Sequence, residues 1–135
     1  GAMDFQELCK RAFAVVNPRE LSELAEAGSV GAALETDTGN VYVGVCMDVA
    51  CSVGFCAEHA AAAAMVTAGE SRVVKMVAVN RQGEPMPPCG RCRELITALH
   101  PENDQAQVMV SRDTVLTLEK LLPYDWKATK RQQKE

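Results

Sequence analysis

The sequence predicts an α/β fold in which helices cover a mixed β-sheet. Segments with helical periodicity alternate along the chain with short β-branched or apolar runs. The run from Val73 to Val79 is almost continuously apolar, which is typical of a strand covered on both faces. Two further apolar runs flank the stretch ETDTGN, whose Asp, Gly and Asn favour a turn, so they predict a hairpin. Interleaved helices and strands indicate a layered sandwich with parallel strands wherever a helix crosses over.

Three helices are expected, at residues 4–16, 57–68 and 90–99. The first has apolar residues at helical spacing and should end at Asn17-Pro18, because proline cannot continue a helix. The second is rich in alanine and is closed by Gly69. Its run Ala60 to Ala64 favours helix strongly and lets a neighbouring backbone or subunit approach closely.

Five strands complete the predicted fold, at residues 29–34, 40–47, 73–79, 107–110 and 115–118. The closing stretch LEKLLPYDW is expected to form a short helical turn. With 135 residues, 47% of them hydrophobic, the chain should form one domain, which we place at residues 4–126. Residues 1–3 look like a cloning remnant, and the polar, basic stretch 127–135 is expected to be a disordered tail.

Charge and hydropathy exclude several classes of function. The net charge of −4 and the lack of a basic run within the domain argue against a nucleic-acid partner. No stretch approaches the roughly 20 apolar residues of a membrane span, and no secretory segment is recognisable at the N-terminus. A cytoplasmic location is therefore expected. The six cysteines should stay reduced there, and their spacing favours a metal site over disulfides.

The stretch PPCGRCREL supplies two candidate metal ligands. Cys89 and Cys92 are three residues apart at the start of a helix, so their side chains share one face and both thiolates can reach one metal ion. A Cys-x-x-Cys pair alone is a weak signal and needs a third ligand. Cys56 can supply it, because this residue stands at the start of another helix on the same sheet. Three protein ligands and one open position are typical of a catalytic zinc.

Glu58 is expected to act beside the metal rather than bind it. Residues i and i+2 of a helix do not face each other, so Cys56 and Glu58 cannot easily hold the same ion. The positions of the ligands at helix N-termini have an electrostatic reason. Three thiolates on Zn²⁺ leave a formal charge near −1, and two helix N-termini contribute roughly half a positive charge each. The helices thereby favour ionisation of water at the metal.

Two other uses of the cysteines stay open at this stage. Cys46 or Cys51 could complete a closed, structural four-cysteine site, which would leave Glu58 without a role. Alternatively, Cys89 and Cys92 could form a redox pair.

Several motifs together resemble the cytidine deaminase family. The motifs are VGAAL at residues 30–34, CAE at 56–58, PPCGRCREL at 87–95 and LLPYDW at 121–126. The resemblance is to the small single-domain form and especially to the blasticidin S deaminase branch. It implies a three-layer α/β/α sandwich with a mixed five-stranded sheet, one Zn²⁺ per chain held by Cys56, Cys89 and Cys92, and a homotetramer whose sites border subunit interfaces.

The resemblance also implies a reaction. A free cytosine nucleoside, such as cytidine, deoxycytidine or the antibiotic blasticidin S, would lose its C4 amine as ammonia and become the uracil form. Glu58 would take a proton from water, pass it to ring N3 and then protonate the leaving amine. Backbone groups near Ala57 and Pro88 would hold the ring edge. The competing interpretation is an inactive zinc-containing binding or assembly module of the same fold.

This sequence departs from the family pattern around the sugar. Cys46 and Asp48 stand where relatives carry an Asn and a Glu that hold the ribose, and Gly28 stands where relatives carry an aromatic residue. A thiol is a weak hydrogen-bonding group, so sugar-hydroxyl recognition should weaken. We expect poor discrimination between cytidine and deoxycytidine and room for bulkier nucleosides, with Gly28 enlarging the wall of the pocket.

Other departures lie near the metal and at the end of the domain. His59 replaces an arginine that in relatives donates hydrogen bonds to the cysteine ligands, and a neutral histidine can still donate one. Arg91 is a second candidate for hydrogen bonds to sulfur, with a subunit interface or simple exposure as the alternatives. Trp126 replaces a phenylalanine and is expected to line a neighbouring subunit's site or to cap the core.

Overall fold

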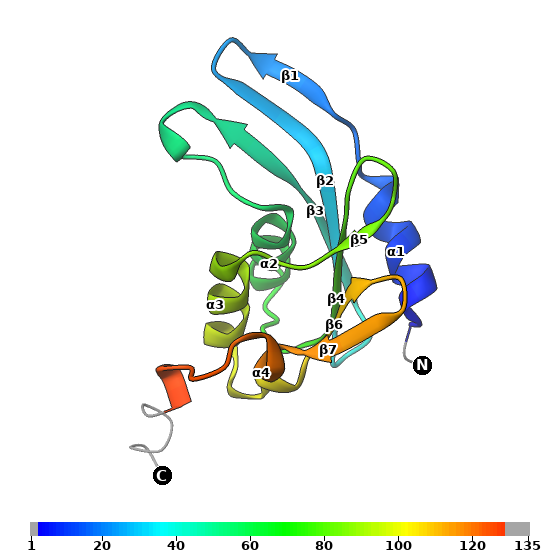
Figure 1. Cartoon of the computed structure of the whole chain (residues 1–135), viewed down its shortest axis with the longest axis vertical. Coiled ribbons are helices and arrows are strands. Elements are labelled where there is room, and N and C mark those ends of the chain that lie inside the picture. The colour runs from blue at the N-terminus through cyan, green and yellow to red at the C-terminus, as the bar shows by residue number, and fades with distance from the viewer. Residues whose placement is uncertain (1–2, 129–135) are drawn as a thin grey trace.

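A computed structural model describes residues 3–128 and shows three layers (Figure 1). Helix α1 covers one face of a central sheet, and α2 and α3 cover the other. In chain order the elements are α1 (Phe5–Ala14), β1 (Arg19–Ser22), β2 (Ala25–Thr36), β3 (Val41–Val49), η1 (Ala50–Ser52), α2 (Ala57–Thr67), β4 (Val73–Val79), β5 (Pro85–Met86), α3 (Gly90–Leu99), η2 (Pro101–Gln105), β6 (Gln107–Ser111), β7 (Thr114–Thr117) and α4 (Leu118–Leu121). The predicted α/β/α sandwich is confirmed.

The sheet has seven strands rather than the five expected. The predicted strands are β2, β3, β4, β6 and β7, which form a continuous sheet in the order β3-β2-β4-β6-β7. Two unpredicted strands extend it: β1 pairs with the start of β2, and β5 pairs with the end of β4. Both were missed because β1 is four exposed residues without alternation and β5 only two residues long. The sheet is mixed, since β4 and β6 are parallel and the other pairs are antiparallel.

Each face of the sheet carries its own buried cluster. On one face, Leu8 and Ala12 of α1 are fully buried against strand residues such as Val77. On the other face, Met65 of α2 and Ile96 of α3 are fully buried in a larger cluster. This larger cluster fixes both helices whose N-termini carry the candidate metal ligands.

Helix α2 packs very closely against strand β3 of the sheet. A Cβ atom added to Gly44 of β3 would lie 2.5 Å from the Ala60 Cβ and 2.5 Å from the Ala61 amide nitrogen. Only glycine on the strand, facing alanine on the helix, permits this approach. The expected close packing of the alanine run is therefore confirmed for Ala60. Ala63 and Ala64 of the same run are exposed in this chain.

The end of α2 is joined to the turn between β2 and β3 by one carboxylate. Gly69 has φ +92° and ends the helix as expected. The carboxylate of Glu70 then accepts hydrogen bonds from Thr38, Tyr42, Asn40 and Thr36. These hydrogen bonds lower the pKa of Glu70 to about 2, and the one from Thr38 has the largest effect on it.

Strand β2 contains a bulge near the start of the VGAAL motif. Ala27 pairs with Met47 and Gly31 with Val45, so three residues of β2, at positions 28–30, lie opposite Cys46 alone. Gly28 has φ +85°, and its carbonyl accepts a hydrogen bond of 2.9 Å from the Asn17 amide. A Cβ atom at Gly28 would lie 2.1 Å from the Asn17 carbonyl oxygen. The expectation that Gly28 enlarges the pocket wall is therefore corrected, because a side chain built there points at Asn17.

The ends of the predicted domain are only partly described. Met3 donates its amide to Glu35 and accepts from Lys75 through its carbonyl. Of the expected tail, Lys127 is buried and forms ion pairs of 3.1 Å with Glu94 and Asp125. Positions 1–2 and 129–135 lie outside the described residues. Among the described helices, none has the length and apolar character required to cross a bilayer.

Candidate active site

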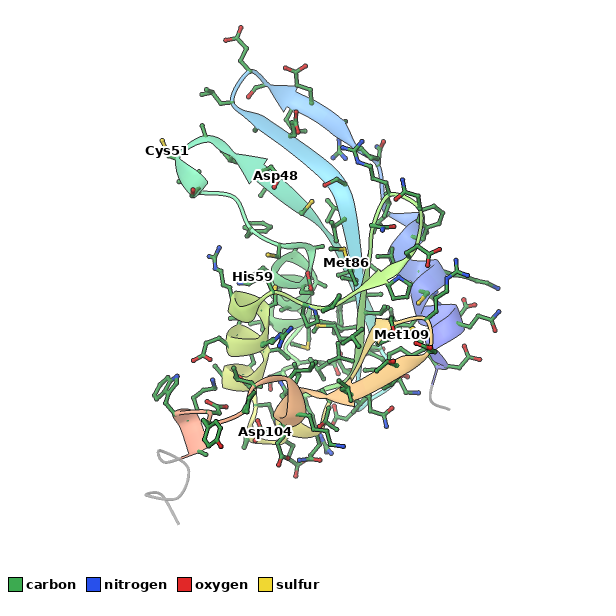
Figure 2. The ribbon with its side chains drawn as sticks, viewed as in Figure 1. Asp48, Cys51, His59, Met86, Asp104 and Met109 are labelled. Atoms are coloured by element: carbon green, nitrogen blue, oxygen red, sulfur yellow. The ribbon has the colours of Figure 1, made fainter. Side chains whose placement is uncertain are left out.

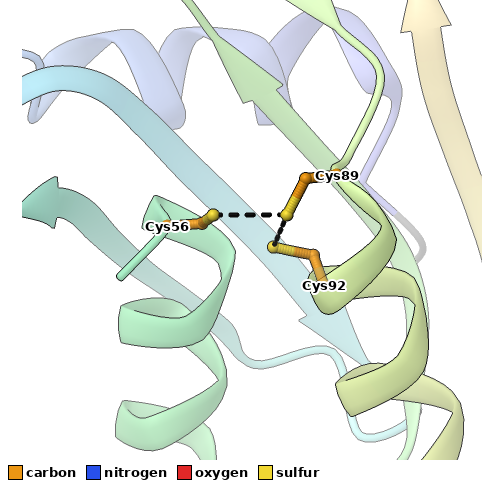
Figure 3. A group of neighbouring side chains, drawn as sticks. All are labelled: Cys56, Cys89 and Cys92. Atoms are coloured by element: carbon orange, nitrogen blue, oxygen red, sulfur yellow. Dashed lines mark hydrogen bonds between the residues drawn. The ribbon is translucent and has the colours of Figure 1, made fainter. Parts of the chain in front are cut away.

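The structure brings three cysteine sulfurs together between α2 and α3 (Figure 3). The Sγ atoms of Cys56, Cys89 and Cys92 all lie within 4.8 Å of one another. Cys89 is central, at 3.3 Å from Cys56 and 3.4 Å from Cys92. These are the three predicted ligands, and among the described residues no other side chain joins them in a possible metal-binding group.

Two helix starts position the sulfurs. Cys56 is the N-cap of α2 and Cys89 the N-cap of α3, while Cys92 lies one turn further along α3. The chain reaches Cys56 through a short backbone pairing in which Phe55 and Met47 exchange two hydrogen bonds of 3.0 Å. This pairing fastens the segment before α2 to strand β3.

The three sulfurs fit a tetrahedral zinc ion. Zn–S bonds of about 2.3 Å separate two ligand sulfurs by about 3.8 Å, so the Cys56–Cys89 and Cys89–Cys92 distances of 3.3 and 3.4 Å need only a few tenths of an ångström of adjustment, and the third pair lies within 4.8 Å. The fourth position of such an ion is left open by the group. Cys46 lies on β3 beside Ser29, and Cys51 is exposed in η1 (Figure 2). Neither completes a closed four-cysteine site within the described chain.

Without a cation, the thiols differ in acidity. Burial, followed by the hydrogen bond with Cys89, raises the pKa of Cys56 to about 11. Burial and then the charge of Glu58 raise the pKa of Cys92 far more. Burial would also raise the pKa of Cys89, but hydrogen bonds from the backbone of Cys92 and Arg91 and from the Cys56 side chain lower it on balance. A divalent cation held here would favour the thiolate forms of Cys56 and Cys92, whose pKa values are raised.

Glu58 lies beside the sulfurs and is almost completely buried. Its side chain is 4% exposed, and burial raises the pKa of its carboxyl. The carboxylate charge in turn raises the pKa of both Cys56 and Cys92, so it interacts with two of the three sulfurs. A buried carboxyl with a raised pKa beside a ligand group can take up and return a proton.

His59 and Arg91 occupy different positions around this group. The His59 Nδ1 atom lies 3.3 Å from the Cys92 sulfur. Burial, together with the charge of Arg91, lowers the pKa of His59, which favours the neutral ring and a single N–H for that contact. Arg91 itself is exposed and donates to the Gly54 carbonyl at 3.4 Å. Its guanidinium bonds to this carbonyl, whereas its backbone N–H contributes a hydrogen bond to the Cys89 sulfur.

A pocket of about 470 Å³ opens beside Cys56. Four predicted residues line it, namely Cys46, Asp48, Cys56 and Arg91. Asp48 is exposed on the part of β3 that extends beyond the helices (Figure 2). Cys46, by contrast, is only 7% exposed. The lining also includes Ser29, Val30 and Phe55, which sequence reasoning missed. Only their nearness to the VGAAL and CAE motifs could have indicated them.

The other predicted substrate contacts lie away from this lining. Ala57 is fully buried at the first position of α2. Pro88 is buried just before Cys89, and its carbonyl accepts a hydrogen bond of 2.9 Å from the Arg93 Nε atom. Arg93 also donates to the Leu121 carbonyl at 2.7 Å and so joins this segment to α4. Trp126 is 60% exposed and donates its indole N–H to Glu94 on the outside of α3.

Comparison with curated proteins finds partial relatives. The cytidine deaminases of two Mycobacterium tuberculosis strains are each 35% identical to this chain over 69 residues, which is 50% of this chain and 52% of theirs. The chain therefore matches about half the length of these curated relatives. No family model matches the sequence.

Solved structures match over nearly the whole chain. The cytidine deaminase of Mycobacterium leprae has a TM-score of 0.76 and 27% identity, and the alignment covers 90% of this chain and 98% of that one. The enzyme of Mycobacterium tuberculosis has a TM-score of 0.77 and 26% identity, and the alignment covers 92% of this chain and 98% of that one. The enzyme of Burkholderia pseudomallei has a TM-score of 0.74 and 26% identity, and the alignment covers 92% of this chain and 100% of that one. Sequence and fold together thus confirm that this chain resembles the cytidine deaminase family.

Proposed function

We propose that this chain is a zinc-dependent hydrolase that removes the C4 amine of a free cytosine nucleoside. The observation that carries the proposal is the buried Glu58 beside three sulfurs that could hold one metal ion, one of which, that of Cys56, belongs to the lining of a pocket of about 470 Å³. The similarity to cytidine deaminases supports the same reaction. Such a volume suits a small ligand.

Cys56, Cys89 and Cys92 would hold the zinc ion. When bound, zinc lowers the pKa of water, so that a nucleophile is available near neutral pH. Glu58 takes a proton from the attacking water and delivers it to ring N3 as the C4–O bond forms. Glu58 then takes the second proton of that water from the C4 hydroxyl and gives it to the departing amine, so that the C4–N bond breaks as the C4 carbonyl forms. The burial that raises its pKa suits both roles. His59 supports the site by holding Cys92 through its ring nitrogen.

The sugar end of the pocket favours a tolerant enzyme. Cys46 and Asp48 line it in place of the family's Asn and Glu, so we propose turnover of cytidine and deoxycytidine with little discrimination. A second pocket of about 220 Å³ shares Ser29 and Asp48 with the first and includes Arg19 and Arg81. This adjoining space supports acceptance of a bulkier cytosine nucleoside such as blasticidin S.

The assembly and location of the protein are further parts of the proposal. The exposed alanines of α2 suit a subunit contact, and we propose a homotetramer in which Trp126 reaches a neighbouring pocket. A monomer in light scattering at micromolar concentration, with full activity, would contradict this assembly. A cytoplasmic location stays a prediction.

The test compares Glu58→Gln with the parent protein, using elemental analysis for zinc and the ultraviolet absorbance change for deamination. The variant should keep about one zinc per chain and lose at least 10²–10⁴-fold in kcat, because one residue serves several proton transfers. Glu119→Gln is the control, since this acid is exposed on α4 and accepts a hydrogen bond from Gln105, away from the sulfurs and the pocket. A zinc-loaded parent that turns over no cytosine nucleoside would favour the inactive binding module and overturn the proposal.

A further inference from the structure

The bulge of β2 gives Ser29 a position that regular strand pairing would not. Three residues, 28–30, stand opposite Cys46, and the bulge is fixed where Gly28 bonds to Asn17. Bulges next to active sites commonly re-aim a side chain. Here both Ser29 and Val30 line the pocket beside Cys56, while a side chain built on Gly28 points away from it.

The hydroxyl of Ser29 lies beside the residue that replaces the family's ribose-binding Asn. Ser29 Oγ is 3.3 Å from Cys46 Sγ, and either atom can donate. A hydroxyl has one donor and two acceptor sites, whereas a thiol is weak in both respects. One contact with sulfur therefore leaves Ser29 with hydrogen-bonding capacity for a ligand. Ser29 also belongs to the lining of both pockets.

We propose that Ser29 is a specificity-determining residue that hydrogen-bonds one hydroxyl of the substrate's sugar. Asp48 lines both pockets too, but it is exposed to water and its interactions are correspondingly weakened. Ser29 is half-buried and is held by the bulge and by Cys46, which pre-orients it. This inference rests on the proposed deaminase function.

The experiment measures kcat and KM of the zinc-loaded protein for cytidine and for its 2′-, 3′- and 5′-deoxy analogues. Ser29→Ala should raise KM for cytidine about 3- to 10-fold and change kcat less than twofold, as expected for loss of one neutral hydrogen bond. For one of the three analogues, the one lacking the contacted hydroxyl, the effect of the substitution should disappear. Ser29→Thr keeps the hydroxyl and should stay close to the parent.

The control is Ser22→Ala, on the neighbouring strand β1 and outside both pockets, with no expected change in KM. If Ser29→Ala raised KM equally for cytidine and all three analogues, Ser29 would only maintain the bulge. If Ser29→Ala left KM unchanged for all four compounds, the sugar would be held elsewhere. Either result overturns the inference while leaving the deaminase function intact. A zinc-loaded parent inactive on all four compounds would instead refute the function itself.

Discussion

Replacing Gly44 by alanine tests how the alanine helix positions the metal site. The added Cβ would lie 2.5 Å from the Ala61 nitrogen, about 0.9 Å inside the 3.4 Å at which ordinary contact begins. Backbone atoms of α2 cannot yield as a flexible side chain can, so the helix must shift. Overpacking of this kind costs about 1–3 kcal/mol. For a domain of this size, that corresponds to a fall in Tm of about 3–15 °C.

The assay is a thermal melt of the zinc-loaded protein, with zinc content measured on the same samples. Because α2 begins at Cys56, a shifted helix should also lower zinc occupancy. Gly90→Ala is the matched control, since a Cβ at Gly90 meets nothing within 4 Å and alanine favours helix. Its Tm should be unchanged or higher. Equal stability and zinc content in Gly44→Ala and the parent would refute the argument that close packing fixes α2.

Two more predictions concern single side chains. Cys89→Ala should lose the one zinc per chain by elemental analysis, whereas Cys51→Ala, altered at an exposed thiol outside the group, should keep it. Glu70→Gln should lower Tm at pH 7 but not at pH 2. The pKa of Glu70 is depressed in the folded state to about 2, from its usual value near 4.5. Its carboxylate therefore stabilises the fold above pH 4.5 and loses this contribution as the pH falls toward 2. A gap in Tm that stayed constant from pH 7 to 2, or one equalled by the exposed-site control Glu23→Gln, would contradict the role of Glu70.

The grouping of the three cysteines could be predicted because local spacing largely determines it. Cys89 and Cys92 share a face of one helix whatever the rest of the fold does, and helix N-caps are recognisable from proline, glycine and helical periodicity. The third ligand required only that two helices lie on the same face of the sheet. The helix 90–99 and the strand 73–79 were accordingly predicted to the residue.

The substrate side was not predictable to the same degree because it depends on strand register. Nothing in the periodicity of residues 25–36 indicates three residues opposite one, and the bulge decides which side chains face the pocket. Counting along the motif therefore assigned Gly28 to the pocket wall and overlooked Ser29. The strand β1 that pairs with this region was missed for a related reason, since its four exposed residues carry no burial pattern.

The register also changes what a substitution at Cys46 would mean. Cys46 is 7% exposed and its sulfur lies 3.3 Å from the Ser29 hydroxyl, so these two positions share one confined space. An asparagine at position 46 is larger than cysteine and would compete with Ser29 for that space, as well as adding an amide to the pocket. Restoring the family's residue alone would therefore mix a gain of one hydrogen-bonding group with displacement of another. The effects of the two positions are expected to be non-additive, since they are in direct contact. We therefore expect sugar recognition to depend on the Ser29–Cys46 pair across β2 and β3, and not on the β3 motif by itself.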